Sequence, residues 1–283
     1  MIPTHHWLEL ERKTFTMKKS IGVLLVALIV LIFALPGCSR SVPEGPGQPA
    51  TEAGGAHKTE PAPARTETGG TKPPAGNKAA DSYAAYQEAK SQLITRLSDA
   101  VSGNPEAGMA MLSFLGITAV DLVMLPAAFL GADEMTMEIG LGMLGAEGFK
   151  YDVDGDKSTV TFKDQSGKET VFAGRFDSKA GGSIFTSVVD GREALYSEYR
   201  QTPYGYAGQY YIVNDDGSVM LYLLAIEGKD GTVGFEQEAT KPEPLSGNEG
   251  PDFPKAAKEW YSIKGKQVTG INPDGQELDF LIP

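Results

Sequence analysis

Turn-forming dipeptides recur through the second half of the chain, and their spacing limits the possible folds more than any other feature. The segments between them are rich in β-branched and aromatic residues, and their apolar and polar positions alternate, as is typical of β-strands. The turns recur about every twelve residues, which leaves no room for helical crossovers, so we predict sequential antiparallel hairpins, a β-meander. The turn signals are Asp154-Gly155, Ser166-Gly167, Gly181-Gly182, Asp190-Gly191, Pro203-Tyr204-Gly205, Asp216-Gly217 and Asp230-Gly231.

These segments predict strands over 159–162, 170–172, 183–189, 193–199, 206–213, 218–226 and 232–238. A loop rich in Pro and Gly follows over 241–254, then a short helical turn near 255–260. A last hairpin is expected from 267–271 and 277–282. An antiparallel sheet of this size must bury one apolar face against another layer.

Helical periodicity precedes the strands. Asp81 or Ser82 is expected to cap a first helix that ends near Gly103. The other expected helices run from Asn104-Pro105-Glu106 to Leu115, from the capping-box pair Thr118 and Asp121 to Gly131 with an interruption at Pro126, and from Asp133 to Leu144. The expected fold class is α+β, with an N-terminal helical segment packed on a large antiparallel β-meander.

The chain between Met109 and Leu144 is apolar on nearly all sides, which predicts buried helices. A transmembrane helix over Met109–Leu130 is the alternative, because the run contains a single charge. That charge, Asp121, lies near the centre of the run, where lipid would penalise it by at least ~2.5 kcal/mol. Gly116 and Pro126 also interrupt the run, so we favour helices of a globular core.

Residues 18–38 have the pattern of a secretory signal. Lys18 and Lys19 supply positive charge ahead of an apolar run over 21–35, and small residues follow it. The run has 15 residues, fewer than the ~20 that a membrane-spanning helix needs. Met17 directly precedes the two lysines and could be the true start of the protein.

The signal closes with Leu35-Pro36-Gly37-Cys38, and Cys38 is the only cysteine of the chain. This tetrapeptide resembles the lipobox of bacterial lipoproteins, in which Leu35 and Gly37 occupy recognition positions before the cysteine. The resemblance implies that residues 1–37 are removed and that the Cys38 thiol carries a diacylglyceryl group, with palmitate as an expected acyl chain. Two or three acyl chains at ~0.8 kcal/mol per buried methylene make a stable lipid anchor. We therefore expect a membrane-anchored, extracytoplasmic protein on the cell surface or the periplasmic face.

The segment from Ser39 to Ala80 is rich in Pro, Gly, Ala, Thr and Glu, and it has almost no large apolar side chain after Val42. Such a composition predicts a disordered linker with an r.m.s. reach of about 35 Å. The expected organisation is a signal peptide over 1–37, acylated Cys38 with its linker over 38–80, a helical subdomain over 81–147 and a β-sheet subdomain over 148–283.

The 25 Lys and Arg residues against 37 Asp and Glu residues give a formal net charge of −12, so nucleic acid is not an expected partner. The histidines are His5, His6 and His57, so residues 81–283 contain neither His nor Cys. This excludes from that region Ser-His-Asp and Cys-His catalysis and metal or haem sites held by His or Cys. We expect no cofactor and no enzymatic activity.

Two groups of residues could form a binding site. An exposed tyrosine row would suit a glycan or peptide, although we favour half-buried tyrosines on neighbouring strands. The row consists of Tyr196, Tyr199, Tyr204, Tyr206, Tyr210 and Tyr211. Methionines suit either an adaptable apolar cavity or an ordinary core, and six of them lie close together in sequence: Met109, Met111, Met124, Met135, Met137 and Met143.

Acidic residues offer two further candidates. Asp152, Asp154 and Asp156 begin like a calcium-binding loop, but lysines stand where an EF-hand needs Gly and a bidentate acid, so an acidic hairpin turn is favoured over weak calcium binding. A glycosidase would need two facing carboxylates. The candidates for such a pair are Glu193, Glu198, Asp215, Asp216, Asp133 and Glu134.

These observations favour a non-enzymatic lipoprotein of the cell envelope that is attached to the membrane through acyl chains on Cys38. Its α+β body is expected to bind an apolar small molecule between the helices and the concave face of the sheet, or an envelope protein. One alternative is a carboxylate-dependent hydrolase of envelope glycan. The other is a structural or assembly subunit of an envelope complex that binds its partner through the tyrosines.

Overall fold

A computed structural model describes residues 79–104, 107–130, 132 and 134–282. The predictions for the signal peptide, for Cys38 and for the linker up to residue 78 therefore lie outside the described residues. Among the residues that are described, no helix is both long and apolar enough to cross a membrane.

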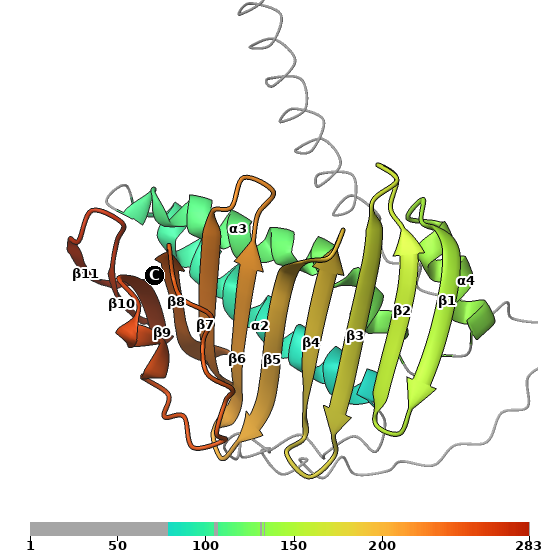
Figure 1. Ribbon diagram of the computed structural model, residues 1–283. Coiled ribbons are helices and arrows are strands. Elements are labelled where there is room, and N and C mark those ends of the chain that lie inside the picture. The colour runs from blue at the N-terminus through green and yellow to red at the C-terminus, as the bar shows by residue number, and fades with distance from the viewer. Residues whose placement is uncertain (1–78, 105–106, 131, 133, 283) are drawn as a thin grey trace, which may run out of the picture. The chain divides into compact units, whose positions relative to one another are not determined.

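The chain from Glu147 onward forms one sheet of eleven antiparallel strands (Figure 1). Strand order in the sheet follows strand order in the sequence, so the predicted β-meander and the α+β class are confirmed. The strands are β1 (Glu147–Asp154), β2 (Lys157–Lys163), β3 (Glu169–Asp177), β4 (Gly182–Val189), β5 (Arg192–Thr202), β6 (Gly205–Val213), β7 (Val219–Glu227), β8 (Asp230–Gln237), β9 (Glu259–Lys264), β10 (Gln267–Ile271) and β11 (Glu277–Leu281).

Two strands, β1 and β9, lie outside the predicted set. The helical turn expected near 255–260 is shorter and earlier than predicted, because the 3-10 helix η3 (Phe253–Ala256) ends before β9 begins. Tyr261 and Ile263 of β9 are buried and Ser262 between them is partly exposed, which is the alternation of a strand with one covered face. The apolar residues of β9 follow the helical turn too closely for the sequence pattern to separate them.

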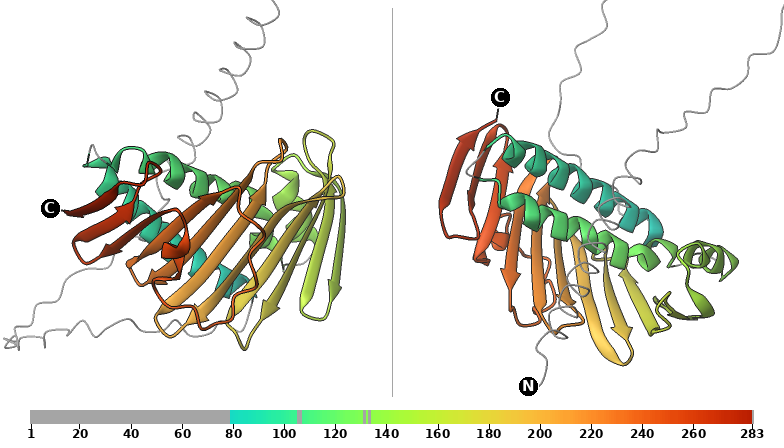
Figure 2. Two further views of the ribbon diagram at one scale, coloured as in Figure 1. Left: turned by 60° about the vertical axis from the view of Figure 1, so that its left-hand side comes forward. Right: turned by 90° about the horizontal axis from the view of Figure 1, so that it is seen from above.

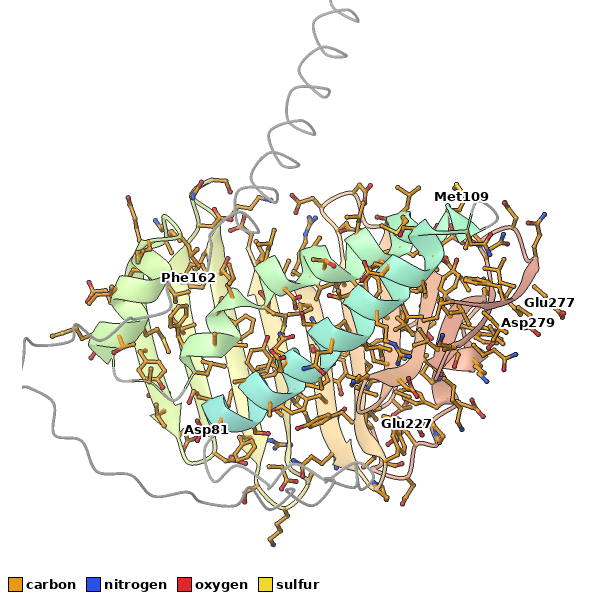
Figure 3. The ribbon with its side chains drawn as sticks, turned by 180° about the vertical axis from the view of Figure 1, so that it is seen from behind. Asp81, Met109, Phe162, Glu227, Glu277 and Asp279 are labelled. Carbon is orange, nitrogen blue, oxygen red and sulfur yellow. The ribbon has the colours of Figure 1, made fainter. Side chains whose placement is uncertain are left out.

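In the described part of the chain, three α-helices precede the sheet: α2 (Ala79–Ser102), α3 (Ala110–Val123) and α4 (Glu134–Gly142). The 3-10 helix η2 (Leu125–Phe129) joins α3 to α4. Figures 2 and 3 show α2 and α3 crossing the same face of the sheet. Helix α4 contacts β1 at one end of the sheet.

The predicted boundary between a helix that ends at Leu115 and another that begins at Thr118 is wrong, because α3 is continuous through both positions. The Thr118 hydroxyl donates to the Phe114 carbonyl at 2.9 Å, a bond typical of threonine inside a helix rather than at its cap. Gly116 does not break the helix. It lets α3 approach the sheet closely, since a Cβ there would lie 2.7 Å from the Tyr222 hydroxyl oxygen.

Aromatic side chains fill the interface between the helices and the sheet. The Tyr86 ring of α2 stacks on Tyr199 of β5 with 4.4 Å between ring centres. The Phe114 ring of α3 lies 5.2 Å from Tyr261 and 5.6 Å from Phe235. All five side chains are buried, so the helices and the sheet share one core.

Polar contacts fix both halves of α2 on the sheet. Near its start, Ser82 accepts a hydrogen bond of 3.1 Å from the Tyr199 hydroxyl. One turn beyond its middle, the Arg96 guanidinium pairs with Asp230 at the β7–β8 hairpin and donates to the Gly265 carbonyl between β9 and β10. The helix therefore bridges strands that lie far apart in the sheet, and its orientation is defined at two points.

Lys90 links α2 to α3. Its side chain is 2% exposed, its ammonium group pairs with the Asp121 carboxylate, and it lies 5.1 Å from the centre of the Tyr210 ring. Burial lowers the pKa of Lys90, and the Asp121 charge acts against that shift. Asp121 therefore has a structural role at the helix–helix contact and does not form the predicted capping box.

Removing one partner of this ion pair should have a very different effect from removing the other. Asp121→Asn leaves an ammonium group buried without its counter-charge, so we expect the free energy of unfolding to fall by about 2–4 kcal/mol. Lys90→Met removes the buried charge and leaves Asp121, which is partly exposed, in contact with water, so we expect a change of at most about 1 kcal/mol. Urea denaturation of both variants measures the difference. Equal losses would contradict this role for Lys90.

Candidate functional site

The helices α3 and α4 expose large apolar side chains, and the prediction that the chain from Met109 to Leu144 is buried is therefore wrong. We call the exposed set the α3–α4 apolar surface. It consists of Met109, Leu112, Leu115, Leu122, Val123, Met135, Ile139, Met143 and Leu144. Figure 3 shows Met109 at one end of this region, where α3 begins.

The geometry of α3 explains this exposure. Phe114, Ile117 and Val120 face the sheet and are buried, which uses one side of the helix. Leu112 and Leu115 lie on the opposite side and are 62% and 53% exposed. The sequence of α3 is apolar on both sides, but the sheet and α2 cover only one of them. The other side is therefore apolar and exposed.

Helix α4 repeats the arrangement. Met137 and Leu141, four residues apart, are buried. Met135, Ile139 and Met143 are also spaced by four residues, and Met135 and Met143 are 71% and 84% exposed. Exposed leucines and methionines in such a row are unusual on a surface helix, whose outer face is normally polar.

The exposure of the α3–α4 apolar surface makes it a candidate interaction site. Each of the nine residues is at least 38% exposed, and large apolar residues gathered on exposed helix faces mark interaction sites more often than singly scattered ones do. Flexible thioethers add adaptability to such a surface. The six methionines of the sequence analysis divide between the two roles. Met124 and Met137 are in the core and Met111 packs against it, while Met109, Met135 and Met143 are exposed.

The six tyrosines of the predicted binding row do not form one exposed row. Tyr199, Tyr206 and Tyr210 are buried in the core. Tyr196 is buried on the other face of the sheet, where its hydroxyl donates to Glu198 at 2.8 Å and Lys241 covers its ring at 4.8 Å. The two that remain, Tyr204 and Tyr211, are partly exposed. Most of these side chains therefore pack the fold and are not accessible to a large ligand.

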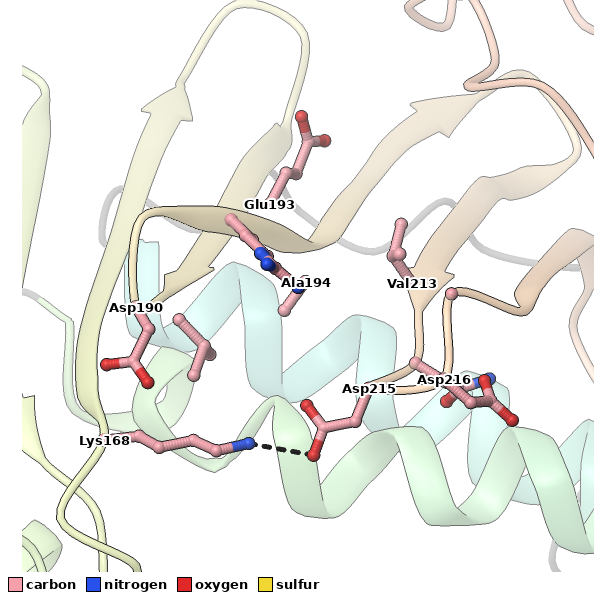
Figure 4. Close-up of a pocket in the computed structure, with 11 residues that line it drawn as sticks. Lys168, Asp190, Glu193, Ala194, Val213, Asp215 and Asp216 are labelled. Atoms are coloured by element: carbon pink, nitrogen blue, oxygen red, sulfur yellow. Dashed lines mark hydrogen bonds and ion pairs between the residues drawn. The ribbon is translucent and has the colours of Figure 1, made fainter.

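Three of the candidate acidic residues line one polar groove of about 750 Å³ between hairpin turns at one end of the inner strands (Figure 4). Glu193 lines the groove next to the β4–β5 turn, and Asp215 and Asp216 form part of the β6–β7 turn. The other charged residues of the lining are Asp190, which the sequence analysis did not select, and the two cations Lys168 and Arg192.

The carboxylates of this groove already have partners. Asp215 pairs with Lys168 at 2.9 Å, and Glu193 pairs with Lys241 at 2.6 Å. Asp216 accepts a hydrogen bond from the Ser218 backbone, and its bonds to Ser218 lower its pKa. A glycosidase acid needs a raised pKa. The lowered pKa of Asp216 therefore does not suit it to act as the acid of such a pair.

The other candidate acids lie elsewhere. Glu198 is 1% exposed, and its carboxylate accepts hydrogen bonds from the Leu245 backbone at 2.8 Å and from Arg200 at 2.7 Å, so it fixes the loop before β9 to the sheet. Glu134 is exposed at the start of α4. Asp133 lies outside the described residues.

The aspartates of the calcium-like sequence lie at the β1–β2 turn, as an acidic hairpin predicts. Asp152 and Asp154 belong to β1, while Asp156 is part of the turn and lies 3.9 Å from Arg175. In the part of the chain that the structure describes, no three His, Cys, Asp or Glu side chains gather closely enough to hold a metal ion.

Comparisons with known proteins give no further guidance on the site. No protein-family model matches the chain, and neither a curated protein nor a solved structure shows significant similarity to it. The function therefore has to be inferred from the residues of this chain alone.

Burial of so many tyrosines should make the protein sensitive to alkali. Desolvation raises the pKa of Tyr86 and Tyr210, and it raises those of Tyr204 and Tyr222 to about 12. In the unfolded chain these groups ionise near pH 10, so the stabilisation is complete below pH 10 and is lost as the pH rises above it, by about 1.4 kcal/mol per pH unit for each fully buried tyrosine.

Denaturation curves at intervals from pH 8 to about pH 11 measure this effect. Lys90 acts in the opposite direction below pH 10.5, because its pKa is lowered, but it is one group against several tyrosines. Tyr210→Phe should make the curve shallower above pH 10. A free energy of unfolding that stays constant across this range would contradict the buried state of the tyrosines.

Proposed function

We propose that the protein is a lipid-anchored, extracytoplasmic lipoprotein without enzymatic activity, which binds an envelope partner through the α3–α4 apolar surface. Exposed leucine and methionine side chains on the outer faces of α3 and α4 are the observation that carries this proposal. Their burial by a partner would stabilise a complex by the same hydrophobic effect that stabilises the core.

An external site is favoured over an internal one. A carrier of apolar small molecules needs a cavity of a few hundred Å³ lined by apolar groups. Here Tyr86 stacks on Tyr199 and Phe114 packs on Phe235 across the interface between helices and sheet, where such a ligand would have to lie. The ligand would have to displace these contacts, whereas the α3–α4 apolar surface is open.

The two rival functions have less support. A glycan hydrolase would have to use carboxylates that are already paired with lysines or bonded to backbone groups. An assembly subunit that binds through the tyrosines would have to use side chains that are mostly buried. Assembly through the α3–α4 apolar surface is compatible with the proposal.

The anchor part of the proposal is supported by the lipobox-like sequence ending at Cys38. A linker of about forty residues would give the globular part a reach of about 35 Å from the membrane. This distance would allow the α3–α4 apolar surface to meet a partner that stands above the lipid headgroups.

Replacing the cysteine tests the anchor. We expect Cys38→Ala to move the protein from the membrane fraction to the soluble fraction of cells, because the thiol that would carry the acyl chains is gone. Immunoblotting of the two fractions measures the change, and Ser41→Ala is a matched control outside the lipobox. An unchanged distribution would exclude acylation of Cys38 as the means of attachment.

Photo-crosslinking in cells tests the binding surface. A photoreactive residue in place of Leu115 should crosslink to a discrete partner, and Leu112→Ser with Leu122→Ser should remove that product because the partner loses its apolar contact. A photoreactive residue in place of Leu281, which is 73% exposed on β11, is the matched control. The same product from both positions, or one that survives the double substitution, would reject the surface.

A further inference from the structure

We infer that the partner is a protein with an apolar groove bordered by Lys or Arg side chains. This inference rests on the proposed function and deepens it by assigning the chemistry of the partner. Every charged residue in the segment that forms the α3–α4 apolar surface is acidic.

The chain contains no Lys or Arg between Arg96 and Lys150, while seven acidic residues lie in that interval. The α3–α4 apolar surface is built entirely from this interval. Its neighbouring charges within the interval are therefore carboxylates. A segment of more than fifty residues without a cation is unusual in a chain that has 25 Lys and Arg residues in all.

The carboxylates lie beside the apolar rows. Glu134 and Glu138 are exposed on α4, and Glu138 lies directly between Met137 and Ile139 in the sequence. On α3, Ser113 donates to the Glu259 carboxylate at 2.7 Å, which brings an acid from β9 to the same helix. Asp121 pairs with Lys90, whereas Glu134 and Glu138 form no ion pair with any residue that the structure describes.

A lipid bilayer does not fit this pattern. Helices that lie in a membrane interface combine an apolar face with Lys and Arg, which contact the anionic headgroups. Helices α3 and α4 contain no basic residue, and the whole chain has a net charge of −12. Anionic lipid would repel this surface.

A second copy of the chain fits no better. A symmetric dimer buries the same patch on both subunits, and the segment that forms this patch has no Lys or Arg that could pair with Glu134 and Glu138 of the other copy. Like charges at an interface oppose association. A basic border removes this conflict and forms ion pairs instead.

The spacing of the apolar residues fits a groove. Leu112, Leu115 and Leu122 follow one side of α3 at intervals of three and seven residues, which is the pattern of anchors that a helix presents to an apolar groove. The inner side of α3 packs on the sheet, so its backbone is already ordered before binding, and Met135 and Met143 can adapt to the groove wall.

Two amphipathic helical peptides provide the probe. Both have a leucine face, and one has lysine and the other glutamate along its border. Fluorescence anisotropy with the full chain should show about tenfold tighter binding of the lysine peptide at low salt, with a smaller preference at high salt. Glu134→Gln with Glu138→Gln should abolish the preference. Glu277→Gln with Asp279→Asn removes two acids from β11 and should leave it unchanged.

The outcomes separate this inference from the proposed function. If Leu112→Ser with Leu115→Ser weakens both peptides equally and the wild type does not distinguish them, the surface binds apolar partners but the basic border is wrong. If that double substitution has no effect on either peptide, both proposals fail. Sedimentation of the Cys38→Ala variant with vesicles of phosphatidylcholine and phosphatidylglycerol that Leu112→Ser with Leu115→Ser abolishes would also overturn the inference. A dimer that the same double substitution dissociates would overturn it too.

Discussion

The structure depends on the packing of α2 against the aromatic inner face of the sheet. A sheet of eleven strands has a large apolar face, and a hairpin meander offers nothing else to cover it. Stacking of Tyr86 on Tyr199 and the two polar attachments at Ser82 and Arg96 fix α2 diagonally across the strands. The position of α3 follows, because it must lie beside α2 and bring Asp121 to Lys90.

This arrangement has a functional consequence. Once α2 and one side of α3 cover the sheet, no further apolar layer is present among the described residues to cover the other side of α3. The sequence nevertheless places leucine at positions 112, 115 and 122, where a polar side chain would serve solubility better. We propose that a partner covers these residues. Between the helices and the sheet, Tyr86 stacks on Tyr199 and Phe114 packs on Phe235, where an internal ligand would have to lie.

The sequence predicts the sheet better than it predicts the helices. Regular turns such as Asp190-Gly191 define hairpins locally, so the meander follows from short-range information. Periodicity can assign a buried side to a helix only if the other side is polar, and α3 is apolar on both, so its exposed row is visible only in the structure. Likewise, burial of Tyr199 and Tyr210 depends on α2, more than a hundred residues earlier.

The proposed function requires the outer side of α3 to be accessible to solvent in the isolated protein. Thiol labelling of Leu115→Cys in a Cys38→Ala background tests it directly, with Leu97→Cys, at a fully buried position, as the reference. We expect Leu115→Cys in the native protein to react nearly as fast as in the unfolded protein, and Leu97→Cys to react far more slowly. Equal protection at both positions would show that another part of the chain covers α3, and it would contradict the proposed surface.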